Sequence, residues 1–493
     1  MINDMRTKMA GMVASLILLG GCTAVKPDVP RIEDYLPRAG RTPIELPGEA
    51  PEEAAVDRRV PGEMTEKPLT VEACVRIALD GNPLLQAARE GVAAAKQAIG
   101  EAKAPYYPTL DLQASYSRWQ SHAFLPSGLS ASGIPGIIGP TDDWLTALEA
   151  RYLVFDSGER RARLASAVAR GGMAAEEAAA ARQDVALAVH IAYYGLLSTL
   201  RGELVAEENL ARAEDHLRLA RDQADVGAVP KADVVRAKVE VADSRLALVR
   251  ARSIVNKARG SLNVAMGLPV SLPVGVETES EELTAPQEAD LAAALEASLD
   301  HRPALRAGLQ KIAAARGEVR AAESAYGPRI TARGKFGRRD AEFFPEDEEW
   351  SAGISLELPI FTGFDRQHRL SREKAELSAE EARLRQLILQ VQDEVWTAYY
   401  GLKEAYEAFE ATVVLVEDAK ESLRLVRERY EAGASTINDL LDAQTALARA
   451  EVKRSTAELD YFAARAVFKH AVGVLLPQDH PASTSTESEP GHE

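Results

Sequence analysis

The chain has 493 residues, a formal net charge of −17 and only 5% aromatic residues. The strong negative charge argues against a nucleic-acid-binding surface, and few aromatics with abundant alanine are typical of long helices. The sequence holds no nucleotide-binding Gly-rich loop, no His-Glu-x-x-His and no Cys-x-x-Cys motif, and its eight histidines are scattered. We therefore expect no enzyme activity, no bound metal and no non-covalent cofactor.

The N-terminus predicts a lipoprotein signal peptide over residues 1–21. Arg6 and Lys8 form a short positive segment, residues 9–19 are apolar, and two glycines precede Cys22. This resembles a bacterial lipobox, in which the cysteine becomes the first mature residue and carries a diacylglyceryl group and an N-acyl chain. An ordinary signal peptide with an incidental cysteine is the alternative.

Residues 22–67 are predicted to form an extended tether behind the lipid, because they contain seven prolines and no apolar periodicity. The only other cysteine, Cys74, lies in a helical pattern and is predicted to be a small core residue.

The rest of the chain is a tandem duplication, with copies at 68–275 and 288–477, a linker at 276–287 and a disordered tail at 478–493. Tyr193-Tyr194-Gly195 matches Tyr399-Tyr400-Gly401 at an offset of 206 residues. Upstream of the strands the offset is 220, as between Pro108 and Pro328. A repeat of this length determines the fold class.

Each copy is predicted to begin with one helix, 70–104 in the first and 288–325 in the second. Two strands with alternating apolar and polar residues follow. They are predicted at 109–119 and 144–155 in the first copy, and at 329–339 and 350–361 in the second. Strands of this length with one apolar face suit a membrane-spanning β-barrel, although a soluble sheet with one wet face shows the same alternation.

Long helices are predicted at 157–226 and 363–432, with return helices at 230–267 and 436–473. About 68 helical residues span roughly 100 Å, and their many charges exclude a bilayer-spanning helix. The return helices repeat large and small apolar residues every seven positions, which predicts coiled-coil packing. Arg454 interrupts the large row of the second copy.

Four strands cannot close a barrel, and open sheet edges are not tolerated in lipid. If the strands cross a membrane, several chains must therefore combine them. At this point the chain resembles the TolC family of outer-membrane efflux proteins, in the lipoprotein branch typified by OprM. The features that carry the resemblance are the duplication, the Leu79–Pro83 motif, Pro108, the Tyr-Tyr-Gly pairs, the turns around Gly227 and Gly433, and the Asp439–Ala443 run.

The resemblance implies a mainly α fold with a transmembrane β part. It implies a homotrimer whose 12-stranded β-barrel, with four strands from each chain, continues into a long periplasmic barrel of α-helical coiled coils. The linker at 276–287 would lie in an equatorial belt around that barrel. The implied location is the outer membrane of a Gram-negative bacterium, with the lipid on Cys22 as an additional anchor.

The implied function is the exit duct of a tripartite efflux system, working with a periplasmic adaptor protein and an inner-membrane pump of the RND type. Small organic compounds are the expected substrates, and metal-ion or protein export is the alternative within this class. A structural or adhesive surface coiled coil without a lumen is the alternative from another class.

The turns between the long and return helices are the expected adaptor contacts. By resemblance, grooves beside Gly227, Ala228, Gly433 and Ala434 receive the adaptor. The other interpretation is that both glycines only end their helices.

Asp439 and Asp442 lie three residues apart at the start of the last return helix, and by resemblance they form the periplasmic gate. The alternative for Asp439 is a capping box with Thr436. In the first copy Asp233 matches Asp439, but Arg236 replaces Asp442. Arg236 of a neighbouring hairpin is therefore a candidate partner of the gate acids.

Overall fold

The computed structural model describes residues 68–122, 137–226, 230–277, 283–432 and 434–476. Residues 67–493 form one compact unit. The predicted signal peptide, Cys22, the tether and the C-terminal tail lie outside the described residues.

The described elements alternate between helices and paired strands in the same order in both copies. They are α2 (Val71–Gly81), α3 (Pro83–Lys103), the short 3-10 helix η3 (Ala104–Tyr106), β1 (Thr109–His122), β2 (Ile137–Phe155), α4 (Glu159–Asp225), α5 (Lys231–Met266), α6 (Glu288–His301), α7 (Pro303–Ser324), β3 (Arg329–Asp340), β4 (Glu348–Glu357), α8 (Asp365–Glu431) and α9 (Ile437–Val472). Among them, no helix has an apolar stretch long enough to cross a membrane.

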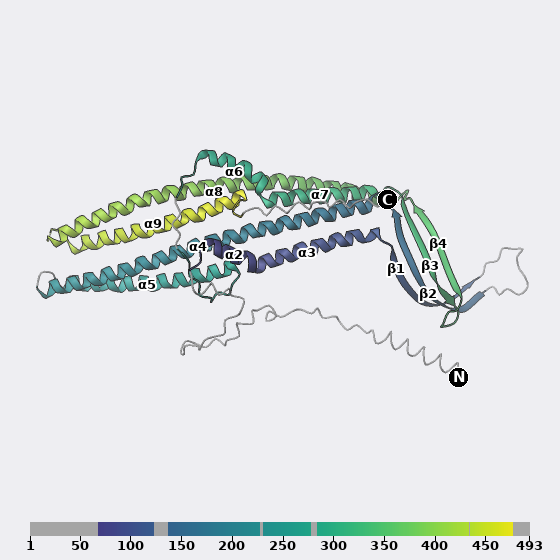
Figure 1. Cartoon of the computed structure of the whole chain (residues 1–493), viewed down its shortest axis with the longest axis horizontal. Helices are drawn as coiled ribbons and strands as arrows, with labels where there is room; N and C mark the ends of the chain where they lie inside the picture. The colour runs from purple at the N-terminus through teal and green to yellow at the C-terminus, as the bar shows by residue number, and fades with distance from the viewer. Residues whose placement is uncertain (1–67, 123–136, 227–229, 278–282, 433, 477–493) are drawn as a thin grey trace, which may run out of the picture. The chain divides into compact units, whose positions relative to one another are not determined.

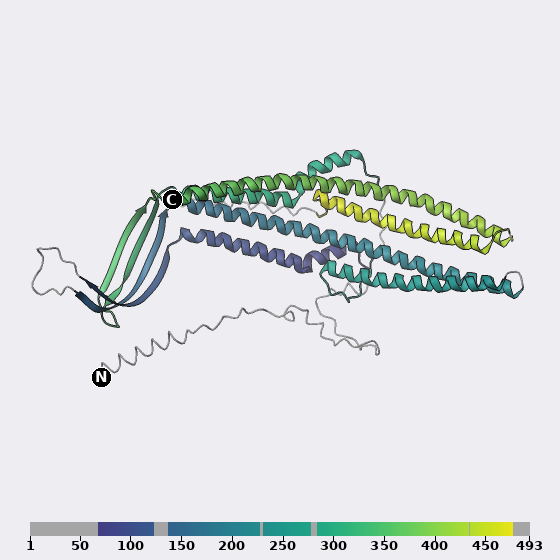
Figure 2. The same ribbon diagram turned by 180° about the vertical axis from the view of Figure 1, so that it is seen from behind.

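The duplication is visible in the lengths of the helices. Helices α4 and α8 have 67 residues each, and α5 and α9 have 36 each. Within the unit the sheet lies at one end of α4 and α8 (Figures 1 and 2). Helices α3 and α7 pack along the halves of α4 and α8 nearer the sheet, and α5 and α9 pack along the halves away from it.

The first helix of each copy is broken, so the predicted single helices 70–104 and 288–325 are wrong. Asn82 separates α2 from α3, and Arg302 separates α6 from α7. Each precedes a proline, which disfavours helical backbone at the residue before it. The Asn82 side chain accepts a hydrogen bond from the Leu84 N–H at 2.9 Å and donates to the Ala265 carbonyl at 3.0 Å. The break therefore ties the helix pair to the end of α5.

A glycine ends each return helix against the corresponding break. Gly267 and Gly473 have φ of 77° and 88°, in the left-handed region that favours glycine. A Cβ on Gly267 would lie 2.8 Å from the Asn82 Cα, and one on Gly473 would lie 2.9 Å from the carbonyl carbon of His301. These two close approaches explain why the sequence ends both helices with glycine.

The four strands form one antiparallel sheet in the order β1-β2-β3-β4. The central β2–β3 pair joins the two copies, and β1 and β4 have free edges. Strand β2 begins at Ile137, seven residues before its predicted start. Strand β4 ends at Glu357 rather than 361, before Pro359, which has no N–H to donate.

The register confirms the predicted apolar face of the sheet. Leu112 pairs with Leu148, Leu148 with Phe336, and Phe336 with Trp350, so one apolar row crosses all four strands. All four of these side chains are exposed, by 45–72%. An exposed apolar face of this size indicates contact with lipid or with another chain.

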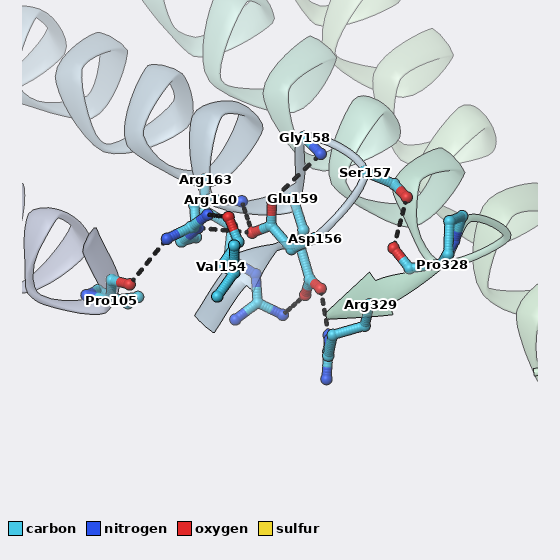
Figure 3. A network of polar contacts seen from close by, with 10 residues as sticks. All are labelled: Pro105, Val154, Asp156, Ser157, Gly158, Glu159, Arg160, Arg163, Pro328 and Arg329. Atoms are coloured by element: carbon cyan, nitrogen blue, oxygen red, sulfur yellow. Dashed lines mark hydrogen bonds and ion pairs between the residues drawn. The ribbon is translucent and has the colours of Figure 1, made fainter. Parts of the chain in front are cut away.

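An arginine fixes the step from sheet to long helix in each copy. Arg160 donates from Nε to the Asp156 carboxylate at 3.0 Å, and from its two terminal nitrogens to the Pro105 and Val154 carbonyls at 3.2 Å each. Its guanidinium also lies 4.9 Å from the centre of the Tyr106 ring. Figure 3 shows the contacts of Arg160 with Asp156, Pro105 and Val154. We call this arrangement the arginine clamp.

The second copy repeats the clamp with one change. Arg366 donates to the Thr362 hydroxyl at 3.1 Å and to the Ile360 and Ala325 carbonyls at 3.1 and 3.5 Å. Its guanidinium lies 4.9 Å from the centre of the Tyr326 ring. Threonine therefore replaces the aspartate of the first clamp.

Contacts between the copies lie beside the first clamp. The Ser157 hydroxyl donates to the Pro328 carbonyl at 2.8 Å, and Glu159 lies 2.5 Å from the Arg329 guanidinium (Figure 3). They fix the start of α4 against the start of β3.

The heptad rows of the return helices face inward. The side chains of Leu248, Leu262, Leu440 and Leu447 are buried, whereas Arg454 is exposed. Arg454 is exposed although Leu447 before it and Tyr461 after it in the same row are buried, and nothing in the structure explains the arginine at this position.

Candidate functional site: the hairpin tips and the seam between hairpins

Asp439 lies in the first turn of α9 and forms the predicted capping box with Thr436. Its carboxylate accepts hydrogen bonds from the Thr436 backbone N–H and hydroxyl, both at 2.8 Å, and its own N–H donates to that hydroxyl at 3.3 Å. These bonds stabilise the ionised carboxylate, so the pKa of Asp439 lies below its ordinary value. The side chain is nevertheless exposed, so capping leaves it accessible to solvent.

Asp442 follows one turn later and is also exposed. In the described part of the chain its carboxylate has neither a hydrogen bond nor an ion pair. Residues three apart on a helix lie on one face, so the second tip presents two neighbouring acids.

The first tip has a different charge pattern. Arg236 and Asp233 form an ion pair of 3.6 Å along α5, with 59% of the arginine side chain and 17% of the aspartate side chain exposed. Within this chain Arg236 therefore contacts Asp233, and the structure does not bring it to Asp439 or Asp442.

The two hairpins contact each other near their tips. The Tyr430 hydroxyl on α8 donates to the Gln223 side chain on α4 at 3.1 Å. Burial raises the pKa of Tyr430, and the negative charge of Asp233 adds to this effect. The predicted adaptor residues Gly227, Ala228 and Gly433 lie outside the described residues. Ala434 is exposed, and its N–H donates to the Arg429 carbonyl at 2.7 Å.

Above the tips, α4 of the first hairpin packs against α9 of the second, and we call this contact the in-chain seam. Two arginines form ion pairs across it: Arg201 with Glu458 at 2.8 Å and Arg212 with Glu451 at 3.7 Å. Both arginines lie on α4 and both acids on α9. Our sequence analysis did not predict these pairs, although a comparison of side-chain charges between the two copies would have drawn attention to them.

Three histidines also lie along this seam. His470 contacts the Asp184 carboxylate at 2.8 Å, and the His216 ring contacts the Gln444 amide. Burial lowers the pKa of His190 to about 4, and the nearby Lys469 and Arg465 act in the same direction. His190 is therefore neutral at pH 7.

A groove of about 440 Å³ runs along α4, α5 and α9. Its walls combine small and polar side chains with charges of both signs, including Ala206, Ala213, Ser244, Thr445, Ala448 and Lys453. Small residues allow a further helix to approach closely, so the groove suits a helical partner.

Comparison with known proteins agrees with this architecture. The family described as outer membrane efflux protein matches residues 74–268 and 294–474. This chain belongs to that family. Protein CyaE of Bordetella pertussis is 27% identical over 381 residues, which are 76% of this chain and 78% of CyaE. Outer membrane protein OprJ of Pseudomonas aeruginosa is 26% identical over 383 residues, which are 75% of this chain and 77% of OprJ.

Solved structures show the same fold. The CmeC outer membrane channel of Campylobacter jejuni has a TM-score of 0.71 at 18% identity, covering 83% of this chain and 86% of CmeC. The outer membrane protein VceC of Vibrio cholerae has a TM-score of 0.69 at 20% identity, covering 82% and 96%.

The family supplies a transport duct rather than an enzyme. The chain is an outer-membrane efflux channel, the exit duct of a tripartite system. The adhesive coiled coil without a lumen is not favoured.

Proposed function

We propose that three copies of this chain form the duct, each contributing its four strands to a closed barrel and its hairpins to a periplasmic tunnel. The observation that carries the proposal is the sheet with an exposed apolar face and two free edges, β1 and β4. Free edges leave unpaired backbone groups, which lipid cannot satisfy. Pairing β4 of one copy with β1 of the next removes every edge.

Conductance measurements test this proposal directly. The purified full-length protein, reconstituted in a planar bilayer, should be trimeric and should produce discrete ion-conducting steps. A stable oligomer that binds the bilayer without conducting ions would contradict the duct. It would favour the adhesive coiled coil instead.

The proposed partners are a periplasmic adaptor that contacts the hairpin tips and an inner-membrane pump of the RND type. Exposed Ala434 and the groove along α4, α5 and α9 support a helical partner at this end. The proposed cargo is small organic compounds. Two relatives that are 24% identical carry the names toluene efflux pump and antibiotic efflux pump outer membrane protein.

The proposed anchor is a lipid on Cys22, next to Thr23. The aspartate typical of inner-membrane retention is missing from this position, so the lipid would enter the outer membrane. Acylation adds membrane affinity, and the barrel would hold the protein there by itself. Mass spectrometry of the mature protein should find an acylated N-terminal Cys22, and an unmodified N-terminus elsewhere would reject the lipobox.

The proposed gate is the acid pair Asp439 and Asp442. Three second tips would bring six carboxylates around the trimer axis, and such a ring favours cations. The exposure of both side chains supports this role, and the capping bonds of Asp439 are compatible with it.

A further inference from the structure

The two copies use opposite charges at matching positions of the hairpins. In the in-chain seam, Arg201 and Arg212 lie on α4, and their acids lie on α9. The offset of 206 residues takes the two arginines to Glu407 and Asp418 on α8. The same offset takes Glu458 and Glu451 back to Arg252 and Arg245 on α5. At the matching positions, acids therefore replace the two arginines and arginines replace the two acids.

Within one chain these four matching residues do not meet. The unit has α4 in contact with α9, but α8 and α5 belong to faces that the chain itself leaves open. Glu407 and Asp418 are exposed, and the described part of the chain offers neither a hydrogen bond nor an ion pair to them. Arg252 contacts Glu203 and Glu207 of its own hairpin, and Arg245 contacts Glu214.

The residues of the in-chain seam are less exposed than their counterparts on α5 and α8. The four in-chain side chains are 24–31% exposed, whereas those of Arg245 and Arg252 are 68% and 57% exposed. Apolar side chains also differ in exposure between the two copies. Tyr194 on α4 stacks on Phe462 and is 6% exposed, but its counterpart Tyr400 on α8 is 45% exposed. Helix α5 exposes Val235, Val239, Leu246 and Val249 by 46–65%.

We propose that α8 of one copy packs on α5 of the next copy, and that Glu407 pairs with Arg252 and Asp418 with Arg245 across this contact. We call it the open seam. The inference rests on the proposed trimer and deepens it, because it names the surface and the residues that select the neighbour. The occupant is a second copy of this chain, since only a second copy carries the complementary α5 face in the matching register.

The sign exchange also excludes wrong neighbours. If α8 met α9 of another copy, Glu407 and Asp418 would face Glu458 and Glu451. If α4 met α5 of another copy, four arginines would face each other. Like charges placed in contact oppose association. The charges therefore favour a ring in which first and second hairpins alternate. A heterologous contact forms such a ring when the rotation between neighbouring copies closes, as the three-fold rotation of the proposed trimer does.

Charge reversal on full-length protein tests the open seam. Variant A carries Glu407→Arg and Asp418→Arg, and variant B carries Arg252→Glu and Arg245→Glu. Each variant alone should lower the temperature at which the detergent-solubilised trimer dissociates, because like charges then meet at all three seams. Combining A and B in one chain should restore the loss caused by A. It should restore only the part of the loss of B that arises between copies, because B also breaks the ion pairs of Arg252 and Arg245 with acids of their own hairpin. High salt should reduce the differences, since exposed charges are screened.

Co-expression provides a readout that misfolding would not produce. With differently tagged A and B chains, a mixed trimer keeps two complementary seams and one repulsive seam, whereas a trimer of A alone or of B alone has three repulsive seams. Native mass spectrometry of chains expressed in equal amounts should therefore find trimers of A alone or of B alone severalfold below their random share of about one quarter.

The matched control is Glu410→Arg with Glu417→Arg on the same helix. Their counterparts on α4, Leu204 and Ala211, are exposed, so these positions lie off the seam. The control should dissociate like the wild type. If A and B behaved like the control and mixed trimers were statistical, the open seam would be wrong while the trimer stood. A wild-type protein that is not trimeric would instead refute the proposed assembly.

Discussion

The two acids of the second tip, Asp439 and Asp442, differ in the hydrogen bonds that their carboxylates accept. Asp439 accepts two hydrogen bonds from Thr436, whereas Asp442 has no such partner in the described part of the chain. Alanine at Asp439 therefore removes a charge and also half of the capping box, which destabilises the first turn of α9. Changes at Asp442 remove charge without this local effect.

The first prediction concerns these charges. Replacing both with alanine should reduce cation selectivity and block by multivalent cations in single-channel recordings. Asp442→Asn should reduce both partially, because it neutralises one of two acids on each tip and keeps the capping bonds. Asp233→Asn is the matched variant, and it should change less because Asp233 is paired with Arg236 in its own helix. Wild-type selectivity and block in the double variant would contradict the gate.

His190 gives a prediction on pH. Burial holds its pKa at about 4, below the ordinary 6.5, so the fold favours the neutral ring. Stability from this residue is complete above about pH 6.5 and falls as the pH decreases toward 4, because the unfolded chain binds the proton more readily. The loss should be about 1–3 kcal/mol. His190→Gln should flatten this part of the curve of melting temperature against pH, and an unchanged curve would show that other groups cause the acid sensitivity.

At the residue scale, sequence could predict what is local. The capping box at Thr436 involves neighbours three residues apart, and the structure confirms it. The partner of Arg236 could not be assigned in the same way, because both an ion pair along α5 and one to another hairpin satisfy its charge. The structure shows that the chain forms the ion pair along α5.

At the scale of elements, the arginine clamps join each long helix to the sheet. The first clamp holds a buried aspartate: the Asp156 side chain is 6% exposed and that of Arg160 is 13% exposed. The second clamp replaces the aspartate with Thr362. Loss of the arginine should therefore have unequal costs, because a buried charge without its partner costs more than an unpaired hydroxyl.

Thermal unfolding of clamp variants checks this difference. Arg160→Ala should cost about 3–5 kcal/mol and Arg366→Ala about 1–3 kcal/mol. Adding Asp156→Thr to Arg160→Ala should recover part of the loss, since it removes the unpaired carboxylate. Equal costs for the two arginines, or no recovery, would show that the aspartate does not set the energetics of the first clamp.

The prediction of helices succeeded where apolar periodicity extends over many turns. It failed where a single residue breaks a helix. The lengths of α4 and α8 follow from about 19 helical turns of pattern in each. The breaks at Asn82 and Arg302 were missed because apolar periodicity continues across them, although the prolines that follow are visible in the sequence. The seam ion pairs were missed because the sequence does not show which helix lies beside α4.

At the scale of the whole molecule, the duplication carries most of the predictable information. It specifies two matching hairpins and two strand pairs, and the sheet order places the copies side by side through β2 and β3. The order of strands was not predictable from alternation alone, because each strand presents the same apolar face to any partner. Within the predicted linker, the Thr284 carbonyl accepts a hydrogen bond from the Tyr461 hydroxyl on α9 at 2.9 Å, and the equatorial position of residues 276–287 stays a prediction.

The last prediction concerns docking at the tips. Ala434 is exposed while its N–H completes the end of α8, so a larger side chain can be added without disturbing the turn. Ala434→Trp should occupy space needed by the adaptor and weaken its binding about tenfold, or roughly 1.4 kcal/mol. Ala228→Trp at the other tip should act likewise. Drug resistance of cells should fall in both cases, while the purified variants remain trimeric.

Ala211→Trp is the matched control, since Ala211 is an exposed alanine on α4 away from the tips. If the tip variants kept wild-type resistance and adaptor affinity, the tips would not be the docking surface, and Gly227 and Gly433 would serve only to end their helices.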